Sequence, residues 1–531
     1  MAKGTKGARQ ADGLVALAAP ELVFGLVGAV GCDLDAVSKA LSESLFAAQY
    51  ESHVIRVSSL LHQLDRYEHL ASLTDRSEYE RISEHMSAGT KLRSLTHRPD
   101  FMAWLSVLAI RGVREQITGP VSPGGVRQTL ASTAFIIKSI KNPAEVQTLR
   151  DVYGRAFFVI AAYAPRDRRV KELAALIATS DGNASSSDYL QQAEELIHRD
   201  EDEQVEDDSG QSVRDSFPLA DVFIDTSSHS GMREGIQRFV EGLFGYPFIT
   251  PTRDEFGMYH AFAASLRSAD LGRQVGAAIA SADGEILSVG CNDVPAAGGG
   301  LYWTGDSPDH RDFRQGIDTS ERFKRAIATQ LVQKLKAAGW ATPTGRTDTE
   351  VARGLVDKKG PLRGTPILSL LEFGRPVHAE MAAIVSAAMR GTSIRGATLF
   401  STTFPCHLCA RHIVAAGIRR VVYVEPYPKS QAEELYGDSL VVDSIGAAGK
   451  RVSFEAFVGI APSIHMWMFK NTGRKDRSGN IAAWSLAGSR PRLKRYVASY
   501  LMIEDQIVGD LLRNKLREVG ITPVKKAGAM L

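Results

Sequence analysis

Short apolar runs alternate with amphipathic segments along the first part of the chain. Residues 33–49 and 142–154 place apolar side chains at helical spacing. Four runs are rich enough in Val, Ile, Phe and Ala to form buried strands: residues 21–30 (ELVFGLVGAV), 51–61, 133–140 and 155–164. Strands that alternate with helices predict a parallel α/β sheet. We therefore expect a first domain over residues 21–244, preceded by a flexible stretch at residues 1–20.

A second α/β pattern follows, and it predicts another domain over residues 245–480. Residues 275–292 predict a β-hairpin with Asp283-Gly284 as its turn. An irregular insert over about residues 296–374 contains one helical segment, and residues 481–531 predict a C-terminal helical segment that packs on another domain or subunit. The remaining predicted elements are the helices 259–274, 320–339, 376–391 and 405–418 and the strands 397–404 and 419–428.

Composition and charge narrow the class of protein. The 531 residues are too many for one hydrophobic core. With 63 Lys and Arg against 61 Asp and Glu, the net charge of +2 gives no support to a general nucleic-acid binder. The N-terminal apolar stretch is too short for a signal peptide, and no run approaches the roughly 20 residues of a membrane span. Four cysteines make no disulfide framework, so we expect a cytoplasmic protein with thiols free for a metal.

The candidate chemistry lies in two short motifs, His378-Ala379-Glu380 and Pro405-Cys406-His407-Leu408-Cys409. One imidazole and two thiolates, from His378, Cys406 and Cys409, suit tetrahedral Zn²⁺. Three protein ligands leave the fourth position for water, as in catalytic zinc sites. Both motifs begin predicted helices, and a helix N-terminus favours the thiolate over the thiol.

Glu380 follows the histidine by two residues, which places a carboxylate beside the metal without making it a ligand. There it can take a proton from an activated water and return it to the reacting molecule. The alternative is a structural zinc site with His407 or His412 as fourth ligand. His407 lies between the cysteines and is expected to point away, whereas His412 continues their i, i+3 spacing.

The spacing H-x-E and P-C-x-x-C resembles that of the zinc-dependent nucleobase deaminases. Residues 273–295 (RQVGAAIASADGEILSVGCNDVP) are similar to the opening of the deoxycytidylate deaminases, so the resemblance covers most of residues 257–295 and 377–427. With the N-terminal domain, the architecture resembles the bacterial anti-phage dCTP deaminases, which deplete the dCTP pool during infection. The resemblance implies a P-loop-like parallel-sheet domain followed by a cytidine deaminase-like α/β/α sandwich. It also implies Zn²⁺ as cofactor, a homo-oligomer, and Glu380 as the proton shuttle to ring N3 and the departing ammonia.

Four residues match substrate-side positions of that family. Asn292 corresponds to the asparagine that contacts the sugar, and Tyr427 to an aromatic residue near the nucleotide. Arg273 and Thr403 match positions beside the substrate and the base pocket; an ordinary turn residue at Asn292 and a surface charge at Arg273 are the alternatives. The chain departs from free-standing deoxycytidylate deaminases at Asp293, where they have glycine, and in its longer insert. Preference for a monophosphate or a triphosphate stays open.

The N-terminal glycine-rich segment departs from a phosphate-binding loop. Residues 28–35 (GAVGCDLD) have Asp, Leu and Asp where GxxxxGK[ST] ends in glycine, lysine and Ser or Thr. The strand–loop–helix context is kept, so Gly28 and Gly31 are candidate nucleotide contacts. The acidic run at residues 198–210 is expected to be solvated. We expect a regulatory domain rather than an efficient ATPase. Positive charge would come from other segments: Lys138, Lys141, Arg166, Arg168 and Arg169.

Three classes of function follow from these observations. The first is hydrolytic deamination of free deoxycytidine nucleotides, dCTP or dCMP, in anti-phage defence or in housekeeping nucleotide metabolism. The second is the editing of cytosine in nucleic acid, which the small net charge does not favour. The third is a non-enzymatic protein with structural zinc. A regulatory RNA or protein partner is left open, and no membrane association is expected.

Overall fold

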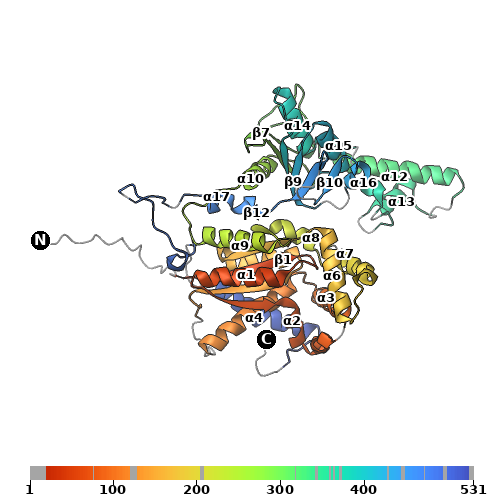
Figure 1. The fold of residues 1–531 in the computed structure, drawn as a ribbon. Helices are drawn as coiled ribbons and strands as arrows, with labels where there is room; N and C mark the ends of the chain where they lie inside the picture. The colour runs from red at the N-terminus through yellow and green to blue at the C-terminus, as the bar shows by residue number, and fades with distance from the viewer. Residues whose placement is uncertain are drawn as a thin grey trace. The chain divides into compact units, whose positions relative to one another are not determined.

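The computed structural model describes residues 19–75, 77–119, 128–201, 203, 209–316, 318–340, 345–357, 360–362, 365–369, 373–426, 430–443, 449–471, 473–476, 478–493 and 499–524. The chain forms two compact units (Figure 1): unit 1 combines Met1–Pro251 with Val458–Leu531, and unit 2 is Thr252–Phe457. Residues 458–480, expected in the second domain, belong to unit 1. Of the stretch expected to be flexible, residues 1–18 lie outside the described residues. In the described part of the chain, no helix combines the length and apolar character that crossing a bilayer requires.

Unit 1 is built on a six-stranded sheet. Its strands are β1 (Leu22–Gly28), β2 (Glu51–Arg56), β3 (Thr133–Ile140), β4 (Phe157–Tyr163), β5 (Val222–Asp225) and β12 (Gly459–Ile460). Their order is β2-β3-β1-β4-β5-β12; the first five are parallel, and β12 is antiparallel to β5. Each of the four predicted apolar runs contains one of these strands, and the expected parallel sheet is present.

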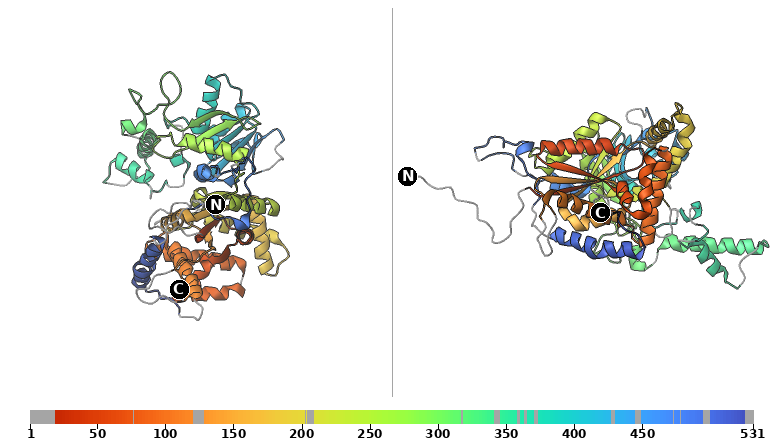
Figure 2. Two further views of the ribbon diagram at one scale, coloured as in Figure 1. Left: turned by 90° about the vertical axis from the view of Figure 1, so that its left-hand side faces the viewer. Right: turned by 90° about the horizontal axis from the view of Figure 1, so that it is seen from below.

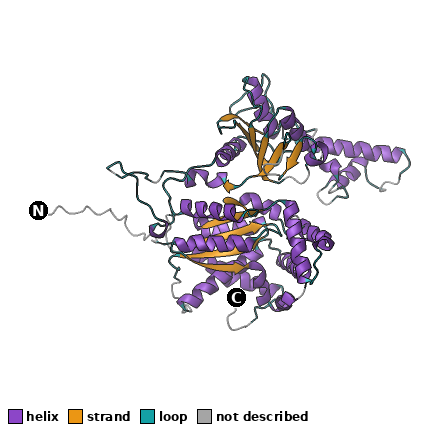
Figure 3. Cartoon of the chain, viewed as in Figure 1, coloured by secondary structure: helices purple, strands orange, loops and turns teal. Residues whose placement is uncertain are grey.

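Helices cover both faces of this sheet (Figures 2 and 3). Leu22, Phe24 and Leu26 of β1 belong to the core shared with α1 and α9, whereas Phe135 of β3 lies below the Arg114 guanidinium of α4 on the other face. The helices of unit 1 are α1 (Leu34–Ala47), α2 (Val57–Leu60), α3 (Glu78–Thr96), α4 (Phe101–Thr118), α5 (Pro143–Tyr153), α6 (Arg166–Ser180), α7 (Leu190–Glu201), α8 (Val213–Ser216), α9 (His229–Leu243), α17 (His465–Met468), α18 (Ser499–Gln506) and α19 (Arg513–Glu518).

Within unit 1, a buried ion network joins the C-terminal helix α18 to the N-terminal part of the chain. The Arg114 guanidinium donates to Glu21 (Nε–Oε1 2.8 Å) and to Glu504 (Nη2–Oε1 2.9 Å), and all three side chains are buried. Tyr500 Oη donates to Glu21 at 2.7 Å. Removing one partner of such a network leaves an uncompensated buried charge, so the network holds the C-terminal segment in place. The predicted C-terminal helical segment therefore packs on the first domain.

Unit 2 is a mixed sheet between two helical layers. Helix α10 contacts β6 and β8 on one face, while α14 and α15 share a core with the other face. The strand order is β10-β11-β9-β8-β6-β7, and β6 is antiparallel to both of its neighbours. The strands are β6 (Gly276–Ala280), β7 (Ile286–Cys291), β8 (Thr398–Thr403), β9 (Arg420–Glu425), β10 (Leu440–Val442) and β11 (Val452–Ala456). The helices are α10 (Arg253–Ser265), α11 (Asp312–Gln315), α12 (Thr319–Ala337), α13 (Asp348–Val356), α14 (Ala379–Met389), α15 (His407–Ala415) and α16 (Ala432–Tyr436).

The helix predicted over residues 259–274 is misplaced. A capping box at Thr252 and Glu255 starts α10 at Arg253, and the helix ends at Ser265. Residues 266–274 instead form the loop that enters β6. In the insert, the predicted helix 320–339 is present as α12, and it packs against α13, which was not predicted.

Gly290 of β7 sets how closely α14 approaches the sheet. A Cβ atom at this position would lie 2.3 Å from the backbone nitrogen of Ala383 and 2.4 Å from the carbonyl oxygen of Ala379. Both atoms belong to the backbone of α14, which cannot rotate away as a side chain can. Only glycine therefore allows α14 to lie at this distance from β7.

Gly290→Ala is expected to lower the free energy of unfolding of unit 2 by about 1–3 kcal/mol, because α14 must move to admit the methyl group. Gly354→Ala in α13 is the matched control, since no described heavy atom lies within 4 Å of a Cβ there. The control is expected to be neutral or stabilising by up to about 1 kcal/mol. Chemical denaturation of both variants makes the comparison, and equal losses of stability would contradict the role of Gly290.

Candidate metal centre

The N-terminal ends of two helices bring the predicted metal ligands together. His378 is the N-cap residue of α14 and Cys406 that of α15, both with extended backbone. Cys409 lies one turn further along α15, on the same side of the helix as Cys406. Because α14 and α15 contact each other and share one core, their first turns meet at one point.

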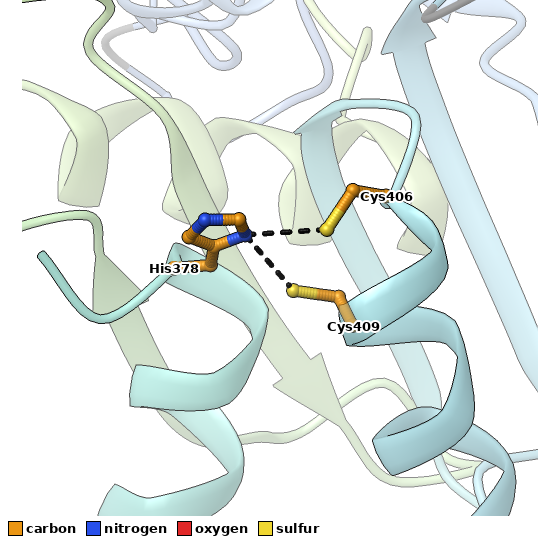
Figure 4. A group of neighbouring side chains, drawn as sticks. All are labelled: His378, Cys406 and Cys409. Carbon is orange, nitrogen blue, oxygen red and sulfur yellow. Dashed lines mark hydrogen bonds between the residues drawn. The ribbon is translucent and has the colours of Figure 1, made fainter. Parts of the chain in front are cut away.

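Figure 4 shows the three side chains pointing toward one another. His378 Nδ1 lies 3.3 Å from Cys406 Sγ and 3.4 Å from Cys409 Sγ, and the three donor atoms all lie within 4.8 Å of one another. Zinc bonds of about 2.3 Å to sulfur and 2.0–2.1 Å to nitrogen, at the tetrahedral angle, place nitrogen and sulfur roughly 3.6 Å apart. The donor set and its spacing therefore fit a zinc ion held by three protein ligands.

The structural-zinc alternative needs a fourth protein ligand. Among the described residues, neither His407 nor His412 belongs to the group of donor atoms. Since structural zinc sites are closed by four protein ligands and catalytic sites by three, the arrangement favours a catalytic site.

Glu380 lies directly beside the three donors. Its side chain is buried, with 4% exposed, and its Oε2 accepts a hydrogen bond from Cys409 Sγ at 3.4 Å. Burial raises the pKa of the Glu380 carboxyl, and the negative charge of Cys406 raises it further. A carboxyl group with a raised pKa holds a proton more firmly, which suits a group that must both accept a proton and carry it.

The environment of Cys406 favours its thiolate form. The hydrogen bond from Cys409, and after it the hydrogen bond and charge of His378, lower the pKa of Cys406 to about 4 against the effect of burial. A thiolate is the form that binds a metal. Cys409 behaves in the opposite way: the hydrogen bond that it donates to Cys406, together with burial, raises the pKa of its thiol, so one of the two thiols is favoured in the metal-binding form.

Comparison with known proteins agrees with this geometry. Residues 251–425 match the family model of the cytidine and deoxycytidylate deaminase zinc-binding region. Unit 2 therefore contains a cytidine deaminase-type zinc-binding domain. The deaminase domain includes the three candidate ligands and Glu380.

Individual relatives match shorter or more distant stretches. The deoxycytidylate deaminase of Enterobacteria phage T2 is 47% identical over 55 residues, which are 10% of this chain and 29% of the phage protein. The chain thus spans less than a third of that relative. The deoxycytidylate deaminase of Pongo abelii is 24% identical over 205 residues, 38% of this chain and 79% of that protein. The crystal structure of the cyanophage S-TIM5 dCMP deaminase in apo form matches 39% of this chain and 100% of its own at 19% identity, with a TM-score of 0.21 that is too low to carry an argument.

A cavity of about 330 Å³ lies beside the metal centre, within the size range of small-molecule pockets. Three of the four predicted substrate residues line it: Arg273, Asn292 and Thr403. The fourth, Tyr427, lies outside the described residues. The insert also contributes to the wall, through Asp312, Asp318 and Thr319. The deaminase domain thus has a cavity of ligand size at its metal centre.

The Asn292 side chain holds the loop that precedes β6. Its Oδ1 accepts from the backbone N–H of Val275 at 2.7 Å, and its Nδ2 donates to the carbonyl oxygen of Arg273 at 2.7 Å. An amide has two N–H donors and two acceptor lone pairs, and these two contacts with described residues use one of each. The structural role of Asn292 and its predicted sugar contact are therefore compatible.

The Arg273 side chain forms an ion pair with Glu425, with Nη1 and Oε2 3.1 Å apart. The same Oε2 accepts a hydrogen bond from Thr403 Oγ1 at 3.2 Å. Glu425 was not among the predicted site residues. Its position at the end of β9, beside the strand end that carries Thr403, is the pattern that indicates it.

Asp293, the position at which the sequence is expected to depart from the family that it resembles, contacts the insert. It is buried, and it accepts from the backbone N–H of Val294 at 2.8 Å. Its Oδ2 lies 3.9 Å from Nη1 of Arg311, a buried arginine of the insert that also donates to Asp309 (Nη2–Oδ2 2.8 Å). The two departures from the family pattern are therefore coupled, although neither Arg311 nor Asp309 was predicted.

The candidate nucleotide contacts of unit 1, Gly28 and Gly31, line a separate cavity of about 520 Å³. Gly28 ends β1, and Gly31 has φ +91°, a conformation that favours glycine. Each of the five cations predicted to supply positive charge is paired with a carboxylate of the chain. The pairs are Lys138–Asp35 (2.5 Å), Lys141–Asp200 (2.8 Å), Arg166–Glu194 (3.7 Å), Arg168–Glu172 (2.6 Å) and Arg169–Glu201 (2.7 Å).

The acidic run at residues 198–210 was expected to be solvated, and at least one of its carboxylates is buried instead. Asp200 is fully buried and Glu201 is paired, whereas solvated side chains were expected. Residues 202 and 204–208 lie outside the described residues.

Cys406→Ser is expected to lower the zinc content of the purified protein from about one to well below one per chain, because it removes one of three protein ligands. Cys291→Ser is the matched control: Cys291 is also a buried cysteine of unit 2, but it lies outside the group of donors. Elemental analysis after dialysis measures both. Loss of zinc from the control alone, or from neither variant, would contradict the assigned ligands.

Proposed function

We propose that unit 2 catalyses the zinc-dependent hydrolytic deamination of deoxycytidine nucleotides to deoxyuridine nucleotides. The observation that carries the proposal is the group His378, Cys406 and Cys409 with the buried Glu380 at the wall of a 330 Å³ cavity. The family match over residues 251–425 and the names of the relatives support a cytosine nucleotide as substrate.

Glu380 moves the protons in this reaction. Zinc, when bound by the three ligands, supplies a Lewis acid that makes water nucleophilic near neutral pH. Glu380 accepts a proton as the water oxygen bonds to C4 of the ring, and it delivers that proton to N3. A second proton passes through the same carboxylate to the amino group, the C4–N4 bond breaks, and ammonia leaves. One water is consumed and one ammonia released, so Glu380 ends as it began.

The substrate contacts proposed from the family positions are consistent with this chemistry. Asn292 uses one N–H and one lone pair in its contacts with the loop and has a second of each with which to contact the sugar, and Thr403 lies beside the base. Arg273, which forms an ion pair with Glu425, is the candidate contact for the phosphate group of the nucleotide. Tyr427 stays a candidate for the aromatic contact.

The substrate is proposed to be the free nucleotide, dCTP or dCMP. The relatives are named as deaminases of a free nucleotide, and the net charge of +2 gives no support to a nucleic-acid substrate. The names of the relatives favour dCMP and a housekeeping role. The resemblance in architecture instead favours dCTP depletion in anti-phage defence, by a cytoplasmic homo-oligomer. In that case unit 1 is the regulatory domain, and it holds the deaminase inactive until infection.

Glu380→Gln is expected to reduce turnover of the preferred nucleotide by about 10²–10⁴-fold or more, because the amide cannot carry the protons. Zinc content is expected to stay at about one per chain, since Glu380 is not a ligand. Release of ammonia from dCTP, dCMP and a cytosine-containing oligonucleotide provides the measurement. Glu285→Gln, at an exposed glutamate of the β6–β7 hairpin, is the control and should keep full activity.

The panel of substrates separates the three classes of function. Product from free nucleotides alone supports the proposal, and product from the oligonucleotide alone supports an editing enzyme. A zinc-loaded wild-type protein inactive on every substrate would indicate either structural zinc or a deaminase held inactive by unit 1, and nucleotide profiling after infection separates these two outcomes. Full activity of Glu380→Gln would refute the proposed proton shuttle.

The role in phage defence has its own test. Cells that express the wild-type protein are expected to lose dCTP and gain deoxyuridine nucleotides after infection, whereas cells that express Glu380→Gln keep their dCTP. Nucleotide profiling before and after infection measures this difference. A dCTP pool that responds equally in both strains would rule out the defence role while leaving the deaminase reaction intact.

A further inference from the structure

The glycine-rich loop of unit 1 borders the 520 Å³ cavity at the carboxyl ends of β1 and β3. Residues 28–35 form one wall, and Lys138 and Lys141 lie on another. The loop after β1, the end of β3 and the helix α6 that follows β4 all contribute to the wall of the cavity. Ligands of open α/β sheets bind outside the carboxyl ends of the strands. The fold therefore presents a ligand cavity next to the loop.

The anion position of this loop is held by a side chain of the protein itself. Asp200, at the end of α7, has no exposed surface. Its Oδ2 accepts from the backbone N–H of Val30 at 2.7 Å and from Nζ of Lys141 at 2.8 Å. Lys141 Nζ also donates to the carbonyl oxygen of Gly28 at 2.9 Å, which holds the lysine against the loop.

These contacts are the ones that a phosphate group makes in related loops. A backbone N–H at the entry to a helix and a lysine ammonium are the donors that hold phosphate oxygens. The lysine missing from the loop itself, where Leu34 stands, is replaced in space by Lys141 from the end of β3. A carboxylate oxygen of Asp200 therefore has the coordination of a phosphate oxygen.

Arg169 provides an independent indication of an anion site. It is 8% exposed and directly abuts the loop, because a Cβ on Gly31 would lie 2.9 Å from its carbonyl oxygen. Its Nη2 donates to Glu201, but its buried Nη1 has no acceptor among the described residues. A polyphosphate bound beside the loop would supply acceptor oxygens, which the Arg169 Nη1 group lacks among the described residues.

We propose that Asp200 is the resident anion of the glycine-rich loop, and that it excludes polyphosphate ligands from unit 1 as long as its contacts with Val30 and Lys141 are in place. The proposal goes beyond the deaminase reaction and does not depend on it. A polyphosphate enters only when α7 withdraws the carboxylate, so occupancy of the loop and the position of α7 are linked. Unit 1 is thus a polyphosphate site closed by its own side chain.

Asp200→Asn is the direct test, because the amide keeps the shape of the side chain and removes its charge. Calorimetric titration of the full-length protein with inorganic pyrophosphate is expected to show binding at least about tenfold tighter in Asp200→Asn than in the wild type. Tenfold corresponds to about 1.4 kcal/mol. The double variant Asp200→Asn, Lys141→Met is expected to bind pyrophosphate no more tightly than the wild type, because it lacks the ammonium group that would hold the phosphate oxygen. Binding of pyrophosphate elsewhere, including the deaminase cavity, is the same in these proteins and cancels in the comparison.

Glu194→Gln is the matched control, since Glu194 is an exposed carboxylate of the same helix and pairs with Arg166 at 3.7 Å. It is expected to bind pyrophosphate like the wild type. If a folded Asp200→Asn protein binds pyrophosphate no more tightly than the wild type, the proposal is overturned.

Hydrogen exchange of the wild type tests the same proposal without a variant. Excess pyrophosphate is expected to leave the amide protection of residues 22–34 unchanged, because the Val30 N–H already has its acceptor. A change in protection of this segment overturns the proposal, even if Asp200→Asn fails to fold.

Discussion

The convergence of two helix N-termini on one face of the second sheet is the constraint on which the chemistry of this chain depends. His378 and Cys406 begin their helices with their donor atoms 3.3 Å apart, and Cys409 completes the group one turn later. This meeting requires α14 to lie close to β7, which Gly290 allows. Glu380, the second residue of α14, is buried and lines the cavity beside the three donors. The position of α14 therefore places both His378 and Glu380.

Features encoded by local spacing could be predicted from the sequence. The apolar runs located the main strands, and the H-x-E and P-C-x-x-C spacings predicted the group of donor side chains that the structure brings together. Strand β12 has only two residues, too few for an alternating pattern to be recognised. Helix α10 starts six residues earlier than predicted, because the capping box at its first turn fixes the start, whereas the prediction used the apolar spacing alone. Helix positions depend on caps as much as on hydrophobic period.

Contacts between distant segments could not be predicted in this way. Arg311 lies 18 residues after Asp293 and reaches it only because the insert folds back on the turn. Glu425 joins Arg273 across 152 residues. Asp200 is the clearest case: an acidic run is usually solvated, yet this member is buried against a loop 170 residues away. Charge pairing of this kind is a property of the tertiary structure, and no periodicity reports it.

The central claim is that three protein side chains hold one zinc ion and leave a position for water. X-ray absorption at the zinc edge of the purified full-length protein tests it most directly. We expect about one zinc per chain, with two sulfur neighbours at about 2.3 Å and, at about 2.0–2.1 Å, one nitrogen of a single imidazole and one water oxygen. A shell of four protein ligands, such as a second histidine beside two sulfurs and no water, or a protein that binds no zinc, would contradict it.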